Sequence, residues 1–184
     1  MIKPIAAGVL VIAVLAVVLL LSMNSVPAVS TTTEQMNAEA AGDWINIELT
    51  DVNTGEKFTI ADFRGKPVLL ETFAVWCPTC RQQQEQIKAL HDEVGDSVIS
   101  VSLDVDPSED EAKVIEHTGR FGFDWRFAVD TEGFGQKLVD QYGINVVNAP
   151  SAPVILICED HSTRLLDFGV KSKSQLQDEL AKGC

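Results

Sequence analysis

The sequence predicts an α/β domain in which helices flank a central mixed β-sheet, with an N-terminal transmembrane helix ahead of it. Short apolar segments alternate with helix-forming segments from residue 67 onward. The wholly apolar segment Val154–Ile157 is typical of a central strand that is covered on both faces. Near the N-terminus, residues 5–21 form one uninterrupted uncharged run.

This N-terminal run spans 17 residues and follows Lys3. At about 1.5 Å per residue, it is near the shortest membrane span and the longest signal-peptide core. We therefore expect residues 1–22 to be a transmembrane anchor or a signal segment, and the length favours the anchor. Residues 26–28 form a small-residue stretch that could be cleaved, so the sequence leaves cleavage open. Because Lys3 favours a cytoplasmic N-terminus, the rest of the chain is expected on the extracytoplasmic side, either membrane-anchored by a single pass or secreted.

Residues 23–42 lack apolar periodicity and are predicted to be a flexible linker, which leaves residues 43–184 for one domain. The formal net charge of −13 argues against nucleic-acid binding, because phosphate contacts need clustered Lys and Arg. The membrane contact is therefore assigned to the N-terminal helix alone, and we expect a monomer.

The elements of the domain can be placed by periodicity and turn signals. Residues 44–60 alternate around a Gly-containing turn and predict a hairpin. A strand over 67–74 runs directly into a helix over 78–94, whose apolar residues lie three and four apart. The remaining elements are expected in the order strand 97–105, helix 108–119 opened by Ser108 and Glu111, strand 126–129, helix 131–142, strand 154–157, strand 163–169 and a helix from 172.

Cys77 and Cys80 lie where the first long strand ends and its helix begins. At a helix N-terminus, unpaired N–H groups and the positive end of the dipole stabilise a thiolate, so Cys77 is predicted to be the attacking sulfur. Cys80, one helical turn later, is predicted to be the resolving thiol that closes a redox-active disulfide. Pro78 fits the first helical turn because its missing N–H needs no partner there.

A Cys-x-x-Cys spacing also supplies half of a zinc site or a small inert disulfide. A zinc site needs a second ligand pair, and Cys158 and Cys184 are too far apart in sequence to form one knuckle. The three histidines show no metal-ligand spacing and are expected at the surface or at helix ends. We therefore predict redox chemistry, with no metal site and no organic cofactor.

The segments Gly65–Leu70 and Phe73–Arg81 resemble those of the extracytoplasmic TlpA/ResA-type branch of thioredoxins, and the resemblance extends over residues 44–182. It implies a thioredoxin fold and a protein-disulfide oxidoreductase that exchanges disulfides with exported proteins, served by a membrane or soluble redox partner. The direction of exchange stays open. The residues that the resemblance places against the substrate are Trp76, Pro78, Thr79, Ala152 and Pro153.

Glu71 lies six residues before Cys77, where thioredoxin-like proteins commonly have a buried acid. Burial would raise its pKa and suit it to accept the Cys80 proton. The alternative is a glutamate at the sheet edge in a surface ion pair.

The family also has a cis-proline opposite the cysteine pair. Pro153 is the favoured position because the apolar strand follows at once, and Pro150 with Ser151 is the second choice. An ordinary trans-proline in a loop remains the alternative. The helix after Cys80 lacks the glutamate and proline that are usual in the family, so the preferred partner stays open.

Cys158 and Cys184 are expected to reach the same pole of the domain if the strand at 154 runs away from the active site. They could then form a structural disulfide, and the alternative is two free thiols. Two other functions stay open for the whole chain. They are a thiol peroxidase, for which no dedicated pocket is apparent, and a copper-binding chaperone that uses Cys77 and Cys80 as soft ligands.

Overall fold

The structure, a computed structural model, describes residues 39–130 and 133–184. The predicted anchor over residues 1–22 and most of the predicted linker lie outside this range. Within the described ranges, no helix combines the length and the apolar character that a membrane crossing needs.

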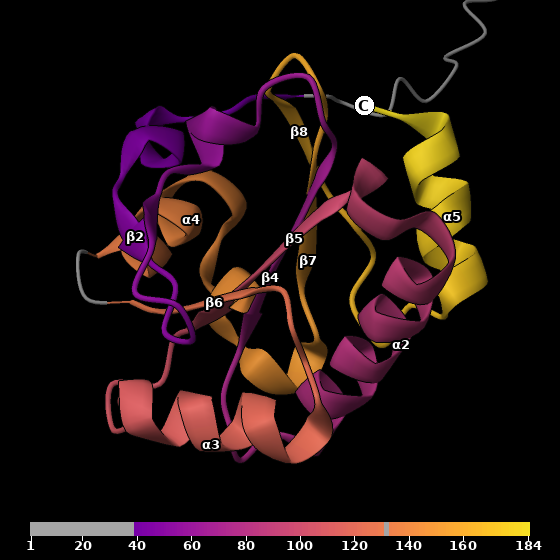
Figure 1. The fold of residues 1–184 in the computed structure, drawn as a ribbon. Coiled ribbons are helices and arrows are strands. Elements are labelled where there is room, and N and C mark those ends of the chain that lie inside the picture. The colour runs from indigo at the N-terminus through magenta and orange to yellow at the C-terminus, as the bar shows by residue number, and fades with distance from the viewer. Residues whose placement is uncertain (1–38, 131–132) are drawn as a thin grey trace, which may run out of the picture. The chain divides into compact units, whose positions relative to one another are not determined.

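A six-stranded sheet forms the centre of the domain, in the order β1-β8-β7-β4-β5-β6, and β2 pairs with β3 in a separate hairpin (Figure 1). β4 runs parallel to β5 and antiparallel to β7, so the sheet is mixed, as predicted. The strands are β1 (Glu39–Ala40), β2 (Leu49–Thr50), β3 (Lys57–Phe58), β4 (Val68–Phe73), β5 (Ile99–Asp104), β6 (Arg126–Val129), β7 (Val154–Ile157) and β8 (Ser162–Leu165). The α-helices are α2 (Pro78–Val94), α3 (Glu111–Phe121), α4 (Phe134–Tyr142) and α5 (Lys173–Lys182).

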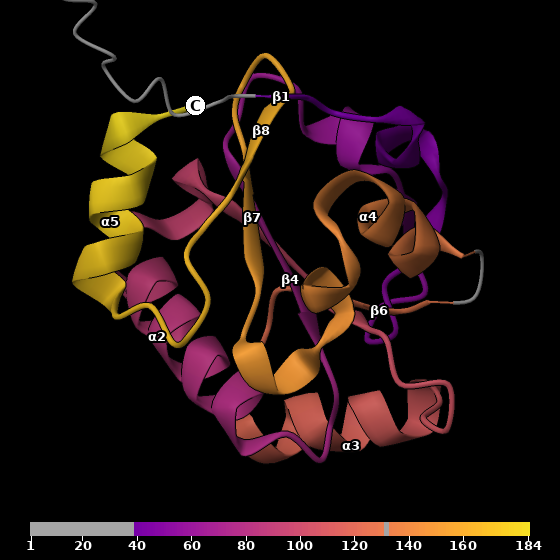
Figure 2. The same ribbon diagram turned by 180° about the vertical axis from the view of Figure 1, so that it is seen from behind.

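The alternation of side chains along β4 creates two separate cores. Leu69 and Phe73 belong to a core shared with α2, α3 and α5, whereas Val68 and Leu70 belong to a core shared with α4. Figure 2 shows α2 and α5 together on one side of the sheet and α4 on the other. The three-layer arrangement predicted from the sequence is therefore confirmed.

Both predicted ends of the helix over 108–119 are wrong, and the strand predicted over 163–169 is shorter, Ser162–Leu165. The helix predicted from Ser108 begins at Glu111, because the Asp110 carboxylate caps it by accepting from the Lys113 N–H over 3.0 Å. It continues past Gly119 and ends before Gly122, whose φ of 66° is the left-handed conformation typical of a helix end.

The N-terminal boundary of the domain also differs from the prediction. Glu39 and Ala40 pair with β8, so these two residues of the predicted linker belong to the sheet. Trp44 begins no strand and lies instead in a short 3-10 helix, Asp43–Asn46, with its side chain buried.

Candidate functional site

The sulfur of Cys77 caps helix α2. Cys77 has an extended backbone just ahead of the helix, and its Sγ accepts a hydrogen bond from the Cys80 N–H over 3.2 Å. Pro78 occupies the first helical position, where it costs no hydrogen bond. Cys77 and Cys80 form a disulfide with 5.4 Å between their Cα atoms. The predicted pairing and the predicted position at the helix N-terminus are both present.

The two cysteines differ in what they face, although each is only 1% exposed. Cys77 lines a groove together with Trp76 and Pro78. The Cys80 Sγ lies underneath, 3.1 Å from the carbonyl oxygen of Ala149. Both cysteines are therefore largely covered in the disulfide state, and Cys77 is the one that borders the groove.

Trp76 and Thr79 both lie beside Cys77. The indole of Trp76 is 59% exposed, and its Nε1 donates to Asp106 Oδ2 over 2.5 Å, so this tryptophan is not a core aromatic. The Thr79 Oγ1 lies 3.8 Å from the Cys77 Sγ. Their predicted substrate contacts therefore fall on the rim of the site.

Glu71 is buried in the centre of the sheet with 2% of its surface exposed, which rules out the edge position. Loss of solvent raises its pKa to about 7, against the opposing effects of Ser102, Gln84 and Lys171. The Ser102 hydroxyl donates to Glu71 Oε1 over 2.6 Å. The carboxyl is thus poised to gain or lose a proton near neutral pH.

Lys171 is a buried cation that the sequence did not single out. It is 6% exposed, and its Nζ donates to the carbonyl oxygens of Ala152 and Asp167. Burial lowers its pKa to about 8, while the nearby Glu71 acts in the opposite direction. Its backbone is held by Gln83, whose side-chain oxygen accepts from the Lys171 N–H over 2.7 Å.

The cis-proline prediction is wrong at both positions, because no peptide bond of the described residues is cis. Pro150 lies inside a 3-10 turn, Ala149–Ser151. The chain then turns into β7 through Ala152, which adopts a left-handed conformation with φ 46° and ψ 57°. Ala149 and Pro150 nevertheless lie beside Trp76 around a shallow pocket, so this turn is a neighbour of the site.

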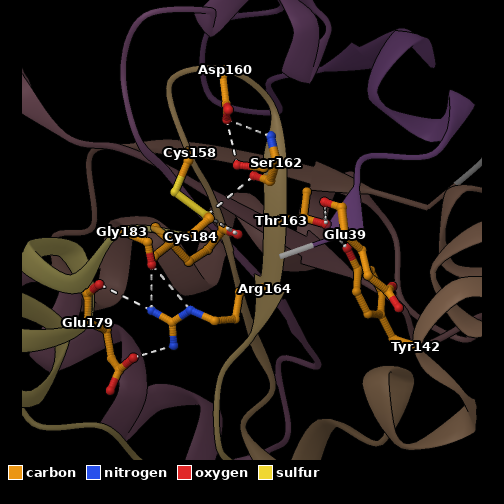
Figure 3. Close-up of a disulfide and its surroundings, with 11 residues drawn as sticks. Glu39, Tyr142, Cys158, Asp160, Ser162, Thr163, Arg164, Glu179, Gly183 and Cys184 are labelled. Carbon is orange, nitrogen blue, oxygen red and sulfur yellow. Dashed lines mark hydrogen bonds and ion pairs between the residues drawn. A yellow bond between two sulfur atoms is a disulfide. The ribbon is translucent and has the colours of Figure 1, made fainter. Parts of the chain in front are cut away.

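Cys158 and Cys184 form a second disulfide, with 6.0 Å between their Cα atoms (Figure 3). The predicted bridge is present, and it attaches the end of the chain to the sheet after β7. Arg164 reinforces this attachment, because its guanidinium donates to the Gly183 carbonyl oxygen and pairs with Glu179. This cluster belongs to the opposite pole of β7 from the turn that carries Pro153.

His117 was expected at the surface or a helix end, but it is only 4% exposed. Burial lowers its pKa to about 4, and the cations of Arg81 and Arg120 act in the same direction. Its Nε2 lies 2.7 Å from Gln84 Oε1, while the buried Gln84 Nε2 has no hydrogen-bond partner among the residues that the structure describes. A polar layer thus continues from α3 across α2 toward Glu71.

Acidic residues after β5 hold the segment that precedes Cys77. Glu109 Oε2 accepts from the Val75 N–H over 2.7 Å. Asp104 is 1% exposed, and burial, with the charges of Glu109 and Asp106, raises its pKa.

Within the ranges that the structure describes, no group of three or more His, Cys, Asp or Glu side chains is arranged to hold a metal ion.

Comparison with known proteins identifies the relatives of this chain. The Redoxin family profile matches residues 22–177. Thiol-disulfide oxidoreductase ResA of Bacillus thuringiensis strain Al Hakam is 26% identical over 137 residues, which is 74% of each chain. The thioredoxin-like protein YneN of Bacillus subtilis strain 168 is 27% identical over 129 residues, 69% of this chain and 71% of its own. The fold also resembles a secreted Mycobacterium tuberculosis disulfide oxidoreductase homologous to E. coli DsbE, with a TM-score of 0.63, 15% identity and coverage of 77% and 99%.

Proposed function

The chain belongs to the Redoxin family and is a TlpA/ResA-type protein-disulfide oxidoreductase with a thioredoxin fold, and from this premise we propose that it exchanges disulfides with exported proteins through Cys77 and Cys80. One observation carries the proposal. The Cys77 Sγ caps helix α2 and accepts the Cys80 N–H. Such a position stabilises a negative sulfur, which is both the nucleophile and the leaving group of exchange.

The reaction begins with the reduced pair. The Cys77 thiolate attacks one sulfur of a substrate disulfide, forming a mixed disulfide and releasing the other substrate sulfur as a thiolate. The Cys80 thiol then loses its proton and attacks the Cys77 Sγ. This second step releases the substrate with both sulfurs reduced and leaves the Cys77–Cys80 disulfide, so two electrons pass from the protein to the substrate. The reverse sequence oxidises a substrate dithiol.

Glu71 is proposed to accept the Cys80 proton in the second step. Its pKa of about 7 makes the carboxylate available near neutral pH, and its burial keeps the proton inside the domain. Gln84 lies one turn beyond Cys80 on α2 and adjoins the Glu71 carboxyl, so this glutamine links the first turns of the active-site helix to the proposed proton acceptor.

Three variants test the exchange step by reduction of insulin with dithiothreitol as the electron source. Cys77→Ser is expected to abolish turnover. Cys80→Ser is expected to accumulate a mixed disulfide with the substrate, because the resolving sulfur is missing. Cys158→Ser with Cys184→Ser serves as the matched control and is expected to retain turnover. Full activity of Cys77→Ser would end the proposal.

The extracytoplasmic location is part of the same proposal. It is supported by the Cys158–Cys184 disulfide, since such bonds persist in oxidising compartments, and by the uncharged run at residues 5–21. In intact cells, a membrane-impermeant thiol reagent is expected to label the domain after reduction. Labelling only after cell lysis would place the domain inside.

The direction of exchange depends on the potential of the pair and on its partner. A membrane or soluble redox protein would restore Cys77 and Cys80 after each turnover. Equilibration in glutathione buffers gives the potential, and acid trapping of cellular samples gives the resident state. A mostly reduced pair in cells would identify a reductant, and a mostly oxidised pair an oxidant.

A further inference from the structure

A groove of about 480 Å³ lies between the start of α2 and the exposed face of α3, and Cys77 forms part of its wall. Its composition differs from that of the whole chain, which has 27 acidic and 14 basic residues. Three cations and one acid line the groove. The lining residues that matter here are Cys77, Arg81, Lys113, Glu116, Arg120 and Phe121.

Two of the cations are arranged around one aromatic ring. The guanidinium of Arg81 lies 5.2 Å from the centroid of Phe121, and that of Arg120 lies 5.4 Å from it. Arg81 also pairs with Glu85 over 3.3 Å. Arg120 is exposed, and among the described residues no carboxylate lies within ion-pairing distance of it.

We propose that this groove binds an acidic segment of the substrate polypeptide next to the substrate cysteine. This inference rests on the proposed function, because a mixed disulfide at Cys77 places the residues that flank the substrate cysteine in the same groove. The guanidinium groups would pair with carboxylates, and Phe121 would contact an apolar side chain. The rest of the chain is negatively charged and repels acidic partners, so an acidic segment is expected to be attracted only at this groove.

The test compares peptides that share one disulfide and differ only in the flanking residues, which are acidic, neutral amide or basic. The reduced protein is expected to react with the acidic peptide about tenfold faster than with the neutral one at low salt, and the preference is expected to shrink at high salt. Arg120→Glu and Lys113→Glu are each expected to lower the acidic-to-neutral rate ratio by about fivefold. Both side chains are exposed, and within the described ranges the Lys113 Nζ donates only to the Ser108 carbonyl oxygen, so the fold is expected to tolerate these changes.

The matched control is Lys137→Glu, a charge reversal at an exposed position of α4 outside the groove. It is expected to leave the rate ratio unchanged. A wild-type ratio near one overturns the proposal, as does a ratio that Arg120→Glu and Lys113→Glu leave unchanged. The proposal is also overturned if the reduced protein reacts faster with glutathione disulfide than with any of the peptides and shows no difference among the peptides.

A binding measurement separates this inference from the exchange reaction. The same peptides with serine in place of cysteine are titrated calorimetrically into the full chain. Tighter binding of the acidic peptide, weakened by Arg120→Glu, supports the groove even if no peptide is reduced, whereas equal binding of all three peptides overturns it. Failure of reduction alone counts against the proposed function.

Discussion

Glu71 on β4 and Ser102 on β5 are register partners in the parallel part of the sheet, and the Ser102 hydroxyl donates to the Glu71 carboxyl over 2.6 Å. A hydrogen bond to a carboxylate lowers its pKa, but burial dominates here and the pKa of Glu71 rises to about 7. The Trp125 indole donates to the same hydroxyl over 2.8 Å and holds it in place. Ser102 therefore orients an acid whose pKa is set mainly by burial.

Replacing Glu71 by Gln is expected to slow the second step of exchange. The amide cannot accept the Cys80 proton, so release of the substrate from the mixed disulfide should fall by about tenfold to a hundredfold near pH 7. In the wild type this step should accelerate as pH rises through about 7, where the Glu71 carboxylate forms. Rapid-quench measurement of single turnovers gives both results. A Glu71→Gln profile that still follows the wild-type curve would remove Glu71 from the reaction.

The same substitution is expected to change the pH dependence of stability. The folded-state pKa of Glu71 is about 7 and lies above the ordinary value of 4.5, so its contribution is fully present below pH 4.5 and is lost as pH rises through 7. The loss amounts to about 3 kcal/mol. Urea unfolding of the oxidised protein should therefore show Glu71→Gln as more stable than wild type at pH 9, with a smaller difference at pH 5. Glu159→Gln, in an exposed turn, is the control and should follow the wild type at both pH values.

Lys171 is expected to lower the pKa of Glu71 and so the pH at which its carboxylate forms. Its charge lowers the pKa of Glu71, so Lys171→Met should raise that pKa and shift the rising part of the rate profile to higher pH. Carboxyl carbon NMR of Glu71 in the oxidised protein reports the same change directly. Lys173→Met removes a more exposed cation, which pairs with Glu93, and should leave the titration of Glu71 in place. An unchanged Glu71 titration in Lys171→Met would show that the two groups are uncoupled.

The sequence predicted the active-site helix closely because its local signals agree. The observed bounds of α2 are marked by Cys77 as the cap, by Pro78 in the first turn and by Gly95 after the last residue. It did not reveal the polar layer under the pair. Gln83 and Gln84 lie three and four residues after Cys80, on the face that also buries Ile87, and this spacing was the available signal.

Other parts of the site depend on contacts between distant segments. Lys171 reads as an ordinary surface lysine, but it is buried where Gln83 of α2 and the turn at Ala152 contact it. The groove charge likewise arises from α2 and α3 packing together, since neither helix is basic along its whole length. Periodicity describes one element at a time and therefore cannot assemble such clusters.

Removal of the second disulfide is expected to destabilise the domain without affecting exchange. Cys158 and Cys184 are separated by 26 positions, and a bond that closes a loop of this length contributes about 3 kcal/mol by restricting the unfolded chain. The double variant Cys158→Ala, Cys184→Ala should lose about this much in urea unfolding. Full reduction of the wild type should remove most of the difference in unfolding free energy between it and the double variant. Equal stability of the two oxidised proteins would contradict a structural role.

Glu109 is expected to hold the segment ahead of Cys77 through one backbone contact, the 2.7 Å hydrogen bond from Val75 N–H to its Oε2. Glu109→Ala leaves this N–H without its acceptor, so the Val75 amide should exchange its hydrogen about tenfold faster. Glu109→Gln retains an acceptor oxygen and should preserve protection. Both variants remove a negative charge that raises the pKa of Asp104, so that pKa should fall in each. Protection that is equal in Glu109→Ala and wild type would show that other contacts hold Val75 and that Glu109 does not anchor the segment ahead of Cys77.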